Sequence, residues 1–171
     1  MIDTPFLYND YGTWIRRQFP FRVQKISIDA GFSCPNRDGR IGKGGCIFCD
    51  NRTFNPSYCS AERSVTRQIA DGKAFFARKY PDMRYIAYFQ AYTNTYAPLD
   101  RLRRLYEEAL EADGVVGLAI GTRPDCVSDE LLDYLADLAR QTSVTVEYGI
   151  ESANDNTLLR INRGHDFACA R

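Results

Sequence analysis

Residues 25–49, KISIDAGFSCPNRDGRIGKGGCIFC, decide both the fold and the candidate site. The stretch opens with alternating residues typical of a β-strand and runs on into a glycine-rich loop. Cys34 follows the strand, eleven residues separate it from Cys46, and two separate Cys46 from Cys49. The sequence therefore predicts a strand that leads directly into a loop with three cysteines.

The same strand-then-helix pattern recurs along the chain. Strands are expected at 23–30, 84–91, 115–121 and 143–150, and helices at 8–18, 61–79, 99–112, 129–140 and 154–162. Helix ends are marked by Pro98, by Ser128 as an N-cap and by Gly164 as a left-handed C-terminal residue. Strands that alternate with helices are typical of a parallel α/β protein with outer helices.

Period two within the strands predicts a barrel or half-barrel whose inner face is polar or small. The expected inner-face residues are Lys25, Ser27, Asp29, Gly117, Ala119, Gly121, Thr145, Glu147, Gly149 and Glu151. Those expected to pack on helices are Leu118, Ile120, Val146, Tyr148 and Ile150. Such a face suggests a ligand that lies across the strand ends.

The three cysteines lie where loops leave the carboxyl ends of parallel strands, which is where α/β folds build active sites. Three thiolates would leave one iron of a 4Fe-4S cluster open to a small molecule, and Arg37, Arg40 and Lys43 would offset its negative charge. Glycines in the loop allow close backbone approach. The alternative is a structural zinc site, which normally needs four ligands; Cys59 could be the fourth.

Composition is that of one soluble globular domain: 171 residues, 44% hydrophobic and 26% charged. Lys plus Arg and Asp plus Glu each total 22, so no overall field favours a nucleic acid or a membrane. No signal peptide or membrane-spanning run is visible. We therefore expect a cytoplasmic protein whose six cysteines are not paired in disulfides.

Four stretches carry a resemblance to a known family: CPNRDGRIGKGGCIFC (34–49), YFQAYTNTYAPL (88–99), GTRPDCV (121–127) and GIESANDNTLLRINRGHD (149–166). They are similar to an uncharacterised bacterial radical S-adenosylmethionine (SAM) family related to the elongator catalytic subunit and to oxygen-independent coproporphyrinogen oxidase. This family shares the widened C-x11-C-x2-C spacing.

The resemblance implies that residues 23–171 are the N-terminal (β/α)4 portion of a partial (β/α)6 radical-SAM barrel, with 1–22 as an N-terminal extension. The chain ends after its fourth β/α unit, so we expect a truncation at its C-terminus.

The resemblance also implies the cofactors and the chemistry. Cys34, Cys46 and Cys49 would bind a 4Fe-4S cluster that reductively cleaves SAM, and the resulting 5′-deoxyadenosyl radical would abstract hydrogen from a substrate. An electron donor such as flavodoxin or ferredoxin is implied, and transfer RNA is a possible substrate by analogy with the elongator subunit. An electron carrier or sensor and a zinc-stabilised binding module stay open as alternatives.

Four further residues are implied as cofactor-binding. Phe48 matches an aromatic near the adenine, and Gln90 lies where relatives have glycines that contact the methionine amino group; those glycines are absent, and Thr93 and Asn94 are weaker candidates. Glu151 and Arg163 match positions that contact the ribose and the methionine carboxylate, which suits the planar fork of arginine. Gly121 stands where several relatives place a cofactor-contacting glutamate. No catalytic residue is assigned beyond these ligands.

The remaining candidates are weaker. His165, the only histidine, is interpreted as a loop or capping residue, and Arg123 as a residue after a strand end within reach of substrate or cofactor. Cys59, Cys126 and Cys169 are interpreted as ordinary thiols.

Overall fold

The computed structural model describes residues 8, 10–53, 55–77 and 82–171. Its strands are β1 (Val23–Ile28), β2 (Arg84–Phe89), β3 (Val115–Thr122) and β4 (Ser143–Tyr148). Its α-helices are α1 (Tyr11–Gln18), α2 (Val65–Ala77), α3 (Leu99–Leu110), α4 (Asp129–Ala139) and α5 (Asp155–Arg160), and short 3₁₀ turns span Asn51–Thr53, Pro124–Cys126 and Ala168–Ala170.

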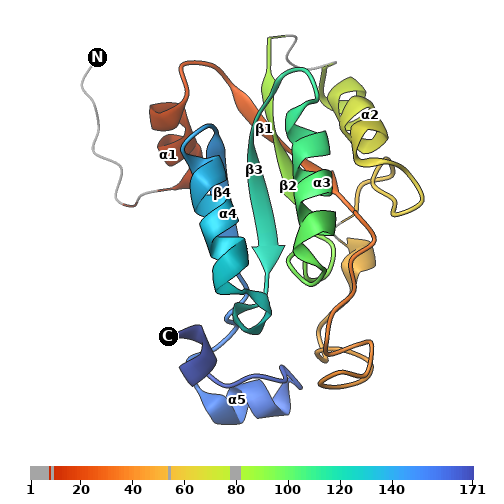
Figure 1. Cartoon of the computed structure of the whole chain (residues 1–171), viewed down its shortest axis with the longest axis vertical. Helices are drawn as coiled ribbons and strands as arrows, with labels where there is room; N and C mark the ends of the chain where they lie inside the picture. The colour runs from red at the N-terminus through yellow and green to blue at the C-terminus, as the bar shows by residue number, and fades with distance from the viewer. Residues whose placement is uncertain (1–7, 9, 54, 78–81) are drawn as a thin grey trace.

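The strands form one parallel sheet in the order β1-β2-β3-β4. Each strand pairs with its predecessor after a helical crossover, which is the arrangement expected of successive β/α units. Figure 1 shows the carboxyl ends of the strands at the end of the molecule that carries α5 and the loop after β1. The predicted α/β fold with a parallel sheet and outer helices is confirmed.

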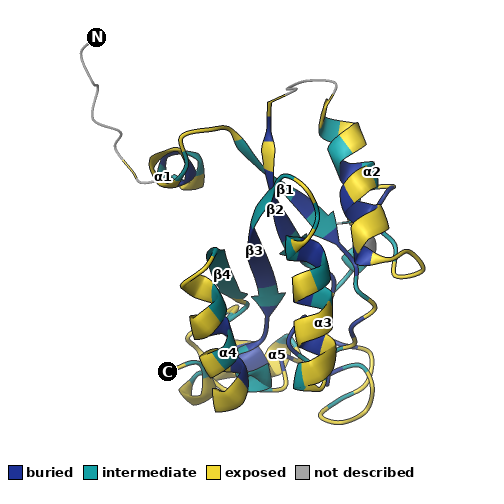
Figure 2. Ribbon diagram, turned by 45° about the horizontal axis from the view of Figure 1, so that its top comes forward, coloured by how far each residue is buried: buried dark blue, intermediate teal, exposed yellow. Residues whose placement is uncertain are grey.

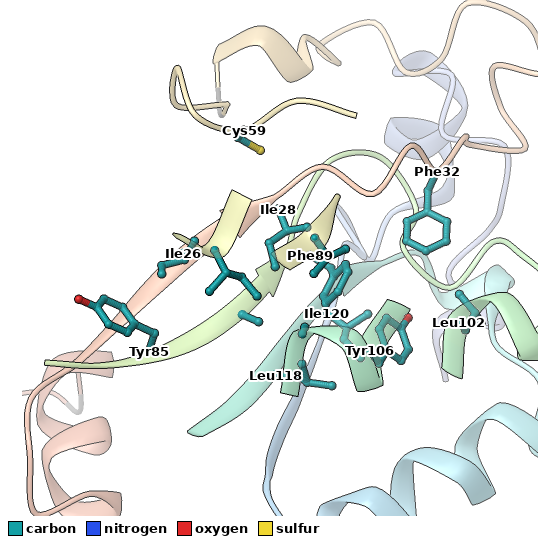
Figure 3. Close-up of a cluster of buried hydrophobic side chains, with 14 of the residues drawn as sticks. Ile26, Ile28, Phe32, Cys59, Tyr85, Phe89, Leu102, Tyr106, Leu118 and Ile120 are labelled. Atoms are coloured by element: carbon teal, nitrogen blue, oxygen red, sulfur yellow. The ribbon is translucent and has the colours of Figure 1, made fainter. Parts of the chain in front are cut away.

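Helices α2, α3 and α4 cover one face of the sheet and bury the main core there. Phe89 of β2 meets Tyr106 of α3 edge to face, with ring centroids 5.1 Å apart (Figure 3). Leu118 and Ile120 of β3 are fully buried beside them. Figure 2 shows this division, with buried residues along the sheet and exposed ones on the outer sides of the helices. Burial of these side chains drives the packing of the layers.

Helix α1 packs on the opposite, inner face of the sheet. Ile15 is buried there with Ile86 of β2 and Ala119 of β3. Nearby, Lys25 of β1 forms an ion pair with Glu147 of β4 across the inner face. The inner-face placement of Lys25, Ala119 and Glu147 is thus as predicted.

The prediction that Tyr148 packs on a helix is wrong, since its side chain is 41% exposed and lies outside the core cluster. Within the described residues β4 pairs only with β3, so the far edge of β4 has no neighbouring strand.

The helix ends follow local capping rules. Ser128 caps α4 by accepting from the Leu131 amide at 3.3 Å, and Pro98 is the residue before α3, both as predicted. Gly164 has the predicted left-handed backbone, with φ of 80°, but it lies beyond the end of α5, so the prediction that it ends the helix is wrong. Asn162 occupies the left-handed position with φ of 54°, because the Arg163 amide donates back to the Leu158 carbonyl at 2.9 Å.

Most of the other predicted bounds are too wide by one to four residues, whereas the strand predicted at 115–121 is one residue too short, since β3 extends to Thr122. Helix 61–79 begins only at Val65, and its last two predicted residues lie outside the described ones. Strand 23–30 stops at Ile28, where the Gln68 side chain takes over the hydrogen bonds of Asp29. No described helix is long and apolar enough to cross a membrane.

Candidate functional site

A cavity of about 330 Å³ opens at the carboxyl ends of the strands, and all three predicted cysteine ligands line it. Its volume lies in the range that holds small-molecule cofactors. The loops after β1, β2, β3 and β4 all contribute to its wall. Its lining residues are Cys34, Arg37, Gly45, Cys46, Phe48, Cys49, Asp50, Asn51, Gln90, Tyr92, Thr93, Arg123, Glu151 and Arg163.

The cysteine loop, residues 34–49, is held by short-range backbone hydrogen bonds. The Cys34 carbonyl accepts from the amides of Arg37 at 2.8 Å and Asp38 at 3.1 Å, and the Cys46 carbonyl accepts from the Cys49 amide at 3.0 Å. Gly45 adopts a φ of +84°, and a Cβ there would lie 2.8 Å from Arg37 Nε. Only glycine meets both requirements without strain.

The segment after α5 fixes the same loop from the other side. The Ile47 amide donates to the Ile161 carbonyl at 3.0 Å, and Asn162 Nδ2 donates to the Gly45 carbonyl at 2.8 Å. Asn36 Nδ2 in turn donates to the Asn162 carbonyl. These contacts join the first and last β/α units, so the cysteine loop is part of the folded body.

One arginine is associated with each of the three cysteines. Arg123 Nη1 lies 3.9 Å from Cys34 Sγ, and Arg163 Nη1 lies 3.5 Å from Cys46 Sγ. Arg37 Nη2 donates to the Cys49 carbonyl at 2.9 Å. Three guanidinium groups around three thiols favour an anionic occupant.

Two amides complete the surroundings of the sulfurs. Asn36 Nδ2 lies 3.7 Å from Cys46 Sγ, and Asn51 Nδ2 lies 3.7 Å from Cys49 Sγ. Hydrogen-bond donors to ligand sulfur are a recognised way of tuning iron–sulfur centres.

Three non-glycine residues with positive φ lie at this edge of the sheet: Tyr92 at 63°, Glu151 at 69° and Asn162 at 54°. Such conformations cost of order 1–3 kcal/mol and cluster at functional sites, where the surrounding structure maintains them. Tyr92 and Glu151 both line the cavity. The observed strain therefore points to the same place as the cysteines.

The residue types around the cavity fit a 4Fe-4S cluster. Among the residues that the structure describes, no three His, Cys, Asp or Glu side chains form a group that could hold a metal ion. A 4Fe-4S cluster needs a different arrangement, because each thiolate binds its own iron atom. Three cysteines around one cavity, with arginines beside them, match that need.

The residues predicted to bind cofactor come together in the cavity. Phe48, Gln90, Glu151 and Arg163 all line it, as does Thr93. Phe48 is 54% exposed, so it is not the core aromatic that its type alone would suggest. Asn94 is fully buried outside the cavity and holds the end of β3 through its 2.8 Å bond to the Gly121 carbonyl.

The other three cysteines lie outside the cavity. Burial and the nearby charge of Asp29 raise the pKa of Cys59 to about 11, and burial raises that of Cys126 to about 12. Both thiols are therefore protonated at neutral pH. Their interpretation as ordinary small residues is consistent with this chemistry.

Sequence reasoning missed part of the site. Tyr92, Asp50 and Asn51 line the cavity although none of them is a predicted site residue. The Tyr92 ring lies beside Arg37, with the guanidinium carbon 5.5 Å from the ring centroid. No sequence pattern predicts this contact or the left-handed φ of Tyr92. A larger recess of about 860 Å³ lies beyond Asp125 and includes none of the three predicted ligands, so its size does not make it the site.

Several curated proteins are similar to this chain. It is 46% identical over 164 residues to protein YhcC of Escherichia coli K12, and the matched residues make up 95% of this chain and 52% of that protein. It is 43% identical over 162 residues to uncharacterised protein YtqA of Bacillus subtilis and 37% identical over 166 residues to uncharacterised protein MJ0486 of Methanocaldococcus jannaschii, in each case over 95% of this chain and 50% of the relative. The chain spans about half the length of these curated relatives.

The sequence profile of the radical SAM superfamily matches residues 36–170. The match includes Cys46, Cys49 and every later residue that lines the cavity. The chain therefore belongs to the radical SAM superfamily.

Proposed function

We propose that this chain is the cluster-bearing part of a radical SAM enzyme. In this proposal Cys34, Cys46 and Cys49 hold a 4Fe-4S cluster, and SAM binds beside it in the cavity at the strand ends. The observation that carries the proposal is that all three cysteines and four implied cofactor-binding residues line one cavity. When bound, this pair would supply a 5′-deoxyadenosyl radical that abstracts hydrogen from a substrate.

The chain's own residues would bind and orient SAM. Phe48 offers an exposed ring for the adenine, and Gln90 an amide at the end of β2 for the methionine amino group. Glu151 would accept from the ribose hydroxyls. Arg163 has five N–H groups, of which three are engaged within the chain, so two stay available for the methionine carboxylate.

The finer assignment extends to the whole protein. We assign residues 23–171 to the radical-SAM core, as the (β/α)4 part of a (β/α)6 barrel that further chain would complete, and 1–22 to an N-terminal extension. From the sequence resemblance to the elongator subunit and coproporphyrinogen oxidase we propose a cytoplasmic enzyme. Its electron donor would be a flavodoxin or ferredoxin, and its substrate class a transfer RNA.

Anaerobic reconstitution of the full-length protein tests the central proposal. About four iron atoms per chain are expected, together with release of 5′-deoxyadenosine on addition of SAM and a reductant. Cys46→Ala should lose both, whereas Cys169→Ala, an exposed cysteine outside the cavity, should keep both. A full cluster without SAM cleavage would contradict the proposal.

The same preparation separates the alternatives. A zinc-stabilised module would be colourless, with about one zinc atom and no iron per chain. An electron carrier or sensor would hold the cluster but would have no SAM site. Calorimetry would then give the same result for wild type, Glu151→Ala and Arg163→Ala, namely no specific SAM binding.

The substrate class needs its own experiment. Modified nucleosides from transfer RNA of a deletion strain and its parent would be compared by mass spectrometry. Loss of one modified wobble uridine is expected, and identical nucleoside profiles would rule out transfer RNA as the substrate.

A further inference from the structure

We propose that Arg123 and Arg163 are positioning residues for the Cys34 and Cys46 thiolates and raise the reduction potential of the cluster. This inference rests on the proposed function for the presence of the cluster. It goes beyond SAM binding because it concerns the sulfur side of each guanidinium.

Arg163 is held against Cys46 by the chain itself. Arg163 is buried, with only 7% of its surface exposed. Nη1 lies 3.5 Å from Cys46 Sγ, Nη2 donates to the Gly149 carbonyl, and Nε donates to His165 Nε2 at 3.0 Å. The three contacts fix the plane of the guanidinium with one edge toward the sulfur, as expected of a preorganised donor.

Arg123 has an equivalent arrangement at Cys34. The residue is 2% exposed, and its Nε and Nη2 both donate to the Asp125 carboxylate at 2.8 Å. This bidentate pair leaves Nη1 directed at Cys34 Sγ, at 3.9 Å. Asp125 therefore orients Arg123 in the same way that Gly149 and His165 orient Arg163.

The buried guanidinium of Arg163 and the positive end of the Arg123–Asp125 ion pair each lie beside a ligand sulfur, and both have a definite electrostatic effect. Reduction adds negative charge to a cluster, and a nearby positive charge with a hydrogen bond to sulfur stabilises the reduced form. Because both arginines are desolvated, solvent screens their charge weakly. Each should therefore shift the potential upward.

The test is an EPR-monitored redox titration of the reconstituted full-length protein without SAM. Arg123→Gln and Arg163→Gln are each expected to lower the ratio of reduced to oxidised cluster at a fixed potential by roughly tenfold, which is about 59 mV for one electron. Arg101→Gln is the matched control. Arg101 donates to the carbonyls of Ala30 and Gly31 at 3.2 Å on the same sheet edge but touches no thiol. The cluster of Arg101→Gln should therefore have the reduction potential of the wild type.

Each outcome decides the inference. Unshifted potentials in both Gln variants, or an equal shift in Arg101→Gln, would overturn it, and a shift in one variant alone would overturn the assignment of the other arginine. If a Gln variant loses iron, Arg123→Lys or Arg163→Lys should restore iron content and potential; persistent loss in the Lys variant would count against the electrostatic role.

Failure of the proposed function looks different. A wild-type cluster that titrates normally but does not cleave SAM contradicts the proposed function. The reduction potentials of the variants can still be compared with wild type, so this inference is still tested. Normal SAM cleavage with unshifted variant potentials defeats this inference alone.

Discussion

Arg123 and Asp125 form a buried bidentate ion pair, with Nε to Oδ1 and Nη2 to Oδ2 distances both of 2.8 Å. Burial by itself raises the pKa of the Asp125 carboxyl, but the hydrogen bonds and charge of Arg123 outweigh it, and the pKa lies below its usual value. An ion pair between two residues of the loop after β3 thus stabilises that loop directly beside Cys34.

This pair predicts a pH-dependent contribution to stability. Because the folded-state pKa of Asp125 is depressed, its contribution is present above the unfolded pKa of about 3.9 and is lost as pH falls through the folded value. Asp125→Asn should lower the free energy of unfolding at pH 7 by about 3 kcal/mol, since it leaves Arg123 buried and unpaired. Urea unfolding at several pH values checks this: the gap to wild type should narrow below about pH 4, and a gap constant with pH would contradict the prediction.

Gly45 should be harder to replace than Gly44, its neighbour in the cysteine loop. Gly45→Ala places a Cβ 2.8 Å from Arg37 Nε at a φ of +84°, whereas Gly44→Ala has nearly the same φ, +85°, with nothing within 4 Å. Gly44→Ala should cost about 1–2 kcal/mol from backbone strain alone, and Gly45→Ala should cost more and lower the iron retained per chain. Equal stability and iron content in the two variants would show that Arg37 moves aside freely.

Glu151 should trade stability for function. Its φ of 69° is strained for a glutamate, so Glu151→Gly should raise the free energy of unfolding by about 1 kcal/mol. The same change should weaken SAM binding several-fold in calorimetry, because it removes the side chain from the cavity. Glu151→Gln keeps the backbone strain and serves as the control; an equal gain of stability in that variant would refute the strain argument.

Lys25 and Glu147 should be energetically coupled across the inner face of the sheet. Lys25 pairs with one carboxylate oxygen, and Tyr88 donates to the other at 2.7 Å. Both charged side chains are partly exposed, at 23% and 36%, so solvent screening limits the expected coupling to about 0.5–1 kcal/mol. A double-mutant cycle of Lys25→Ala and Glu147→Ala in urea unfolding measures it, and additive single-variant losses would mean no coupling.

The sequence was sufficient for the sheet and for the convergence of the cysteines. Short alternating strands between helices imply parallel pairing, and parallel pairing brings every strand's carboxyl end to one edge. That is why Gln90 and Glu151, each directly after or close to a strand end, could be expected near Cys34.

Contacts set by tertiary packing were beyond reach. Arg123 lies 89 residues from Cys34 in the sequence, and Arg163 lies 117 from Cys46, so no local pattern pairs them. The packing of α1 on the inner face and the exposure of Tyr148 depend in the same way on which layers meet, not on periodicity within a strand.

The bond from Asn162 Nδ2 to the Gly45 carbonyl has a consequence for how the protein is made. It spans 117 residues of chain, and the neighbouring bond from Asn36 to the Asn162 carbonyl spans 126. Contacts of such long sequence separation form late, because loop closure must precede them. During synthesis on the ribosome, the cysteine loop therefore emerges long before the segment that shapes it, and its thiols reach their native arrangement only once residue 163 is free to fold back.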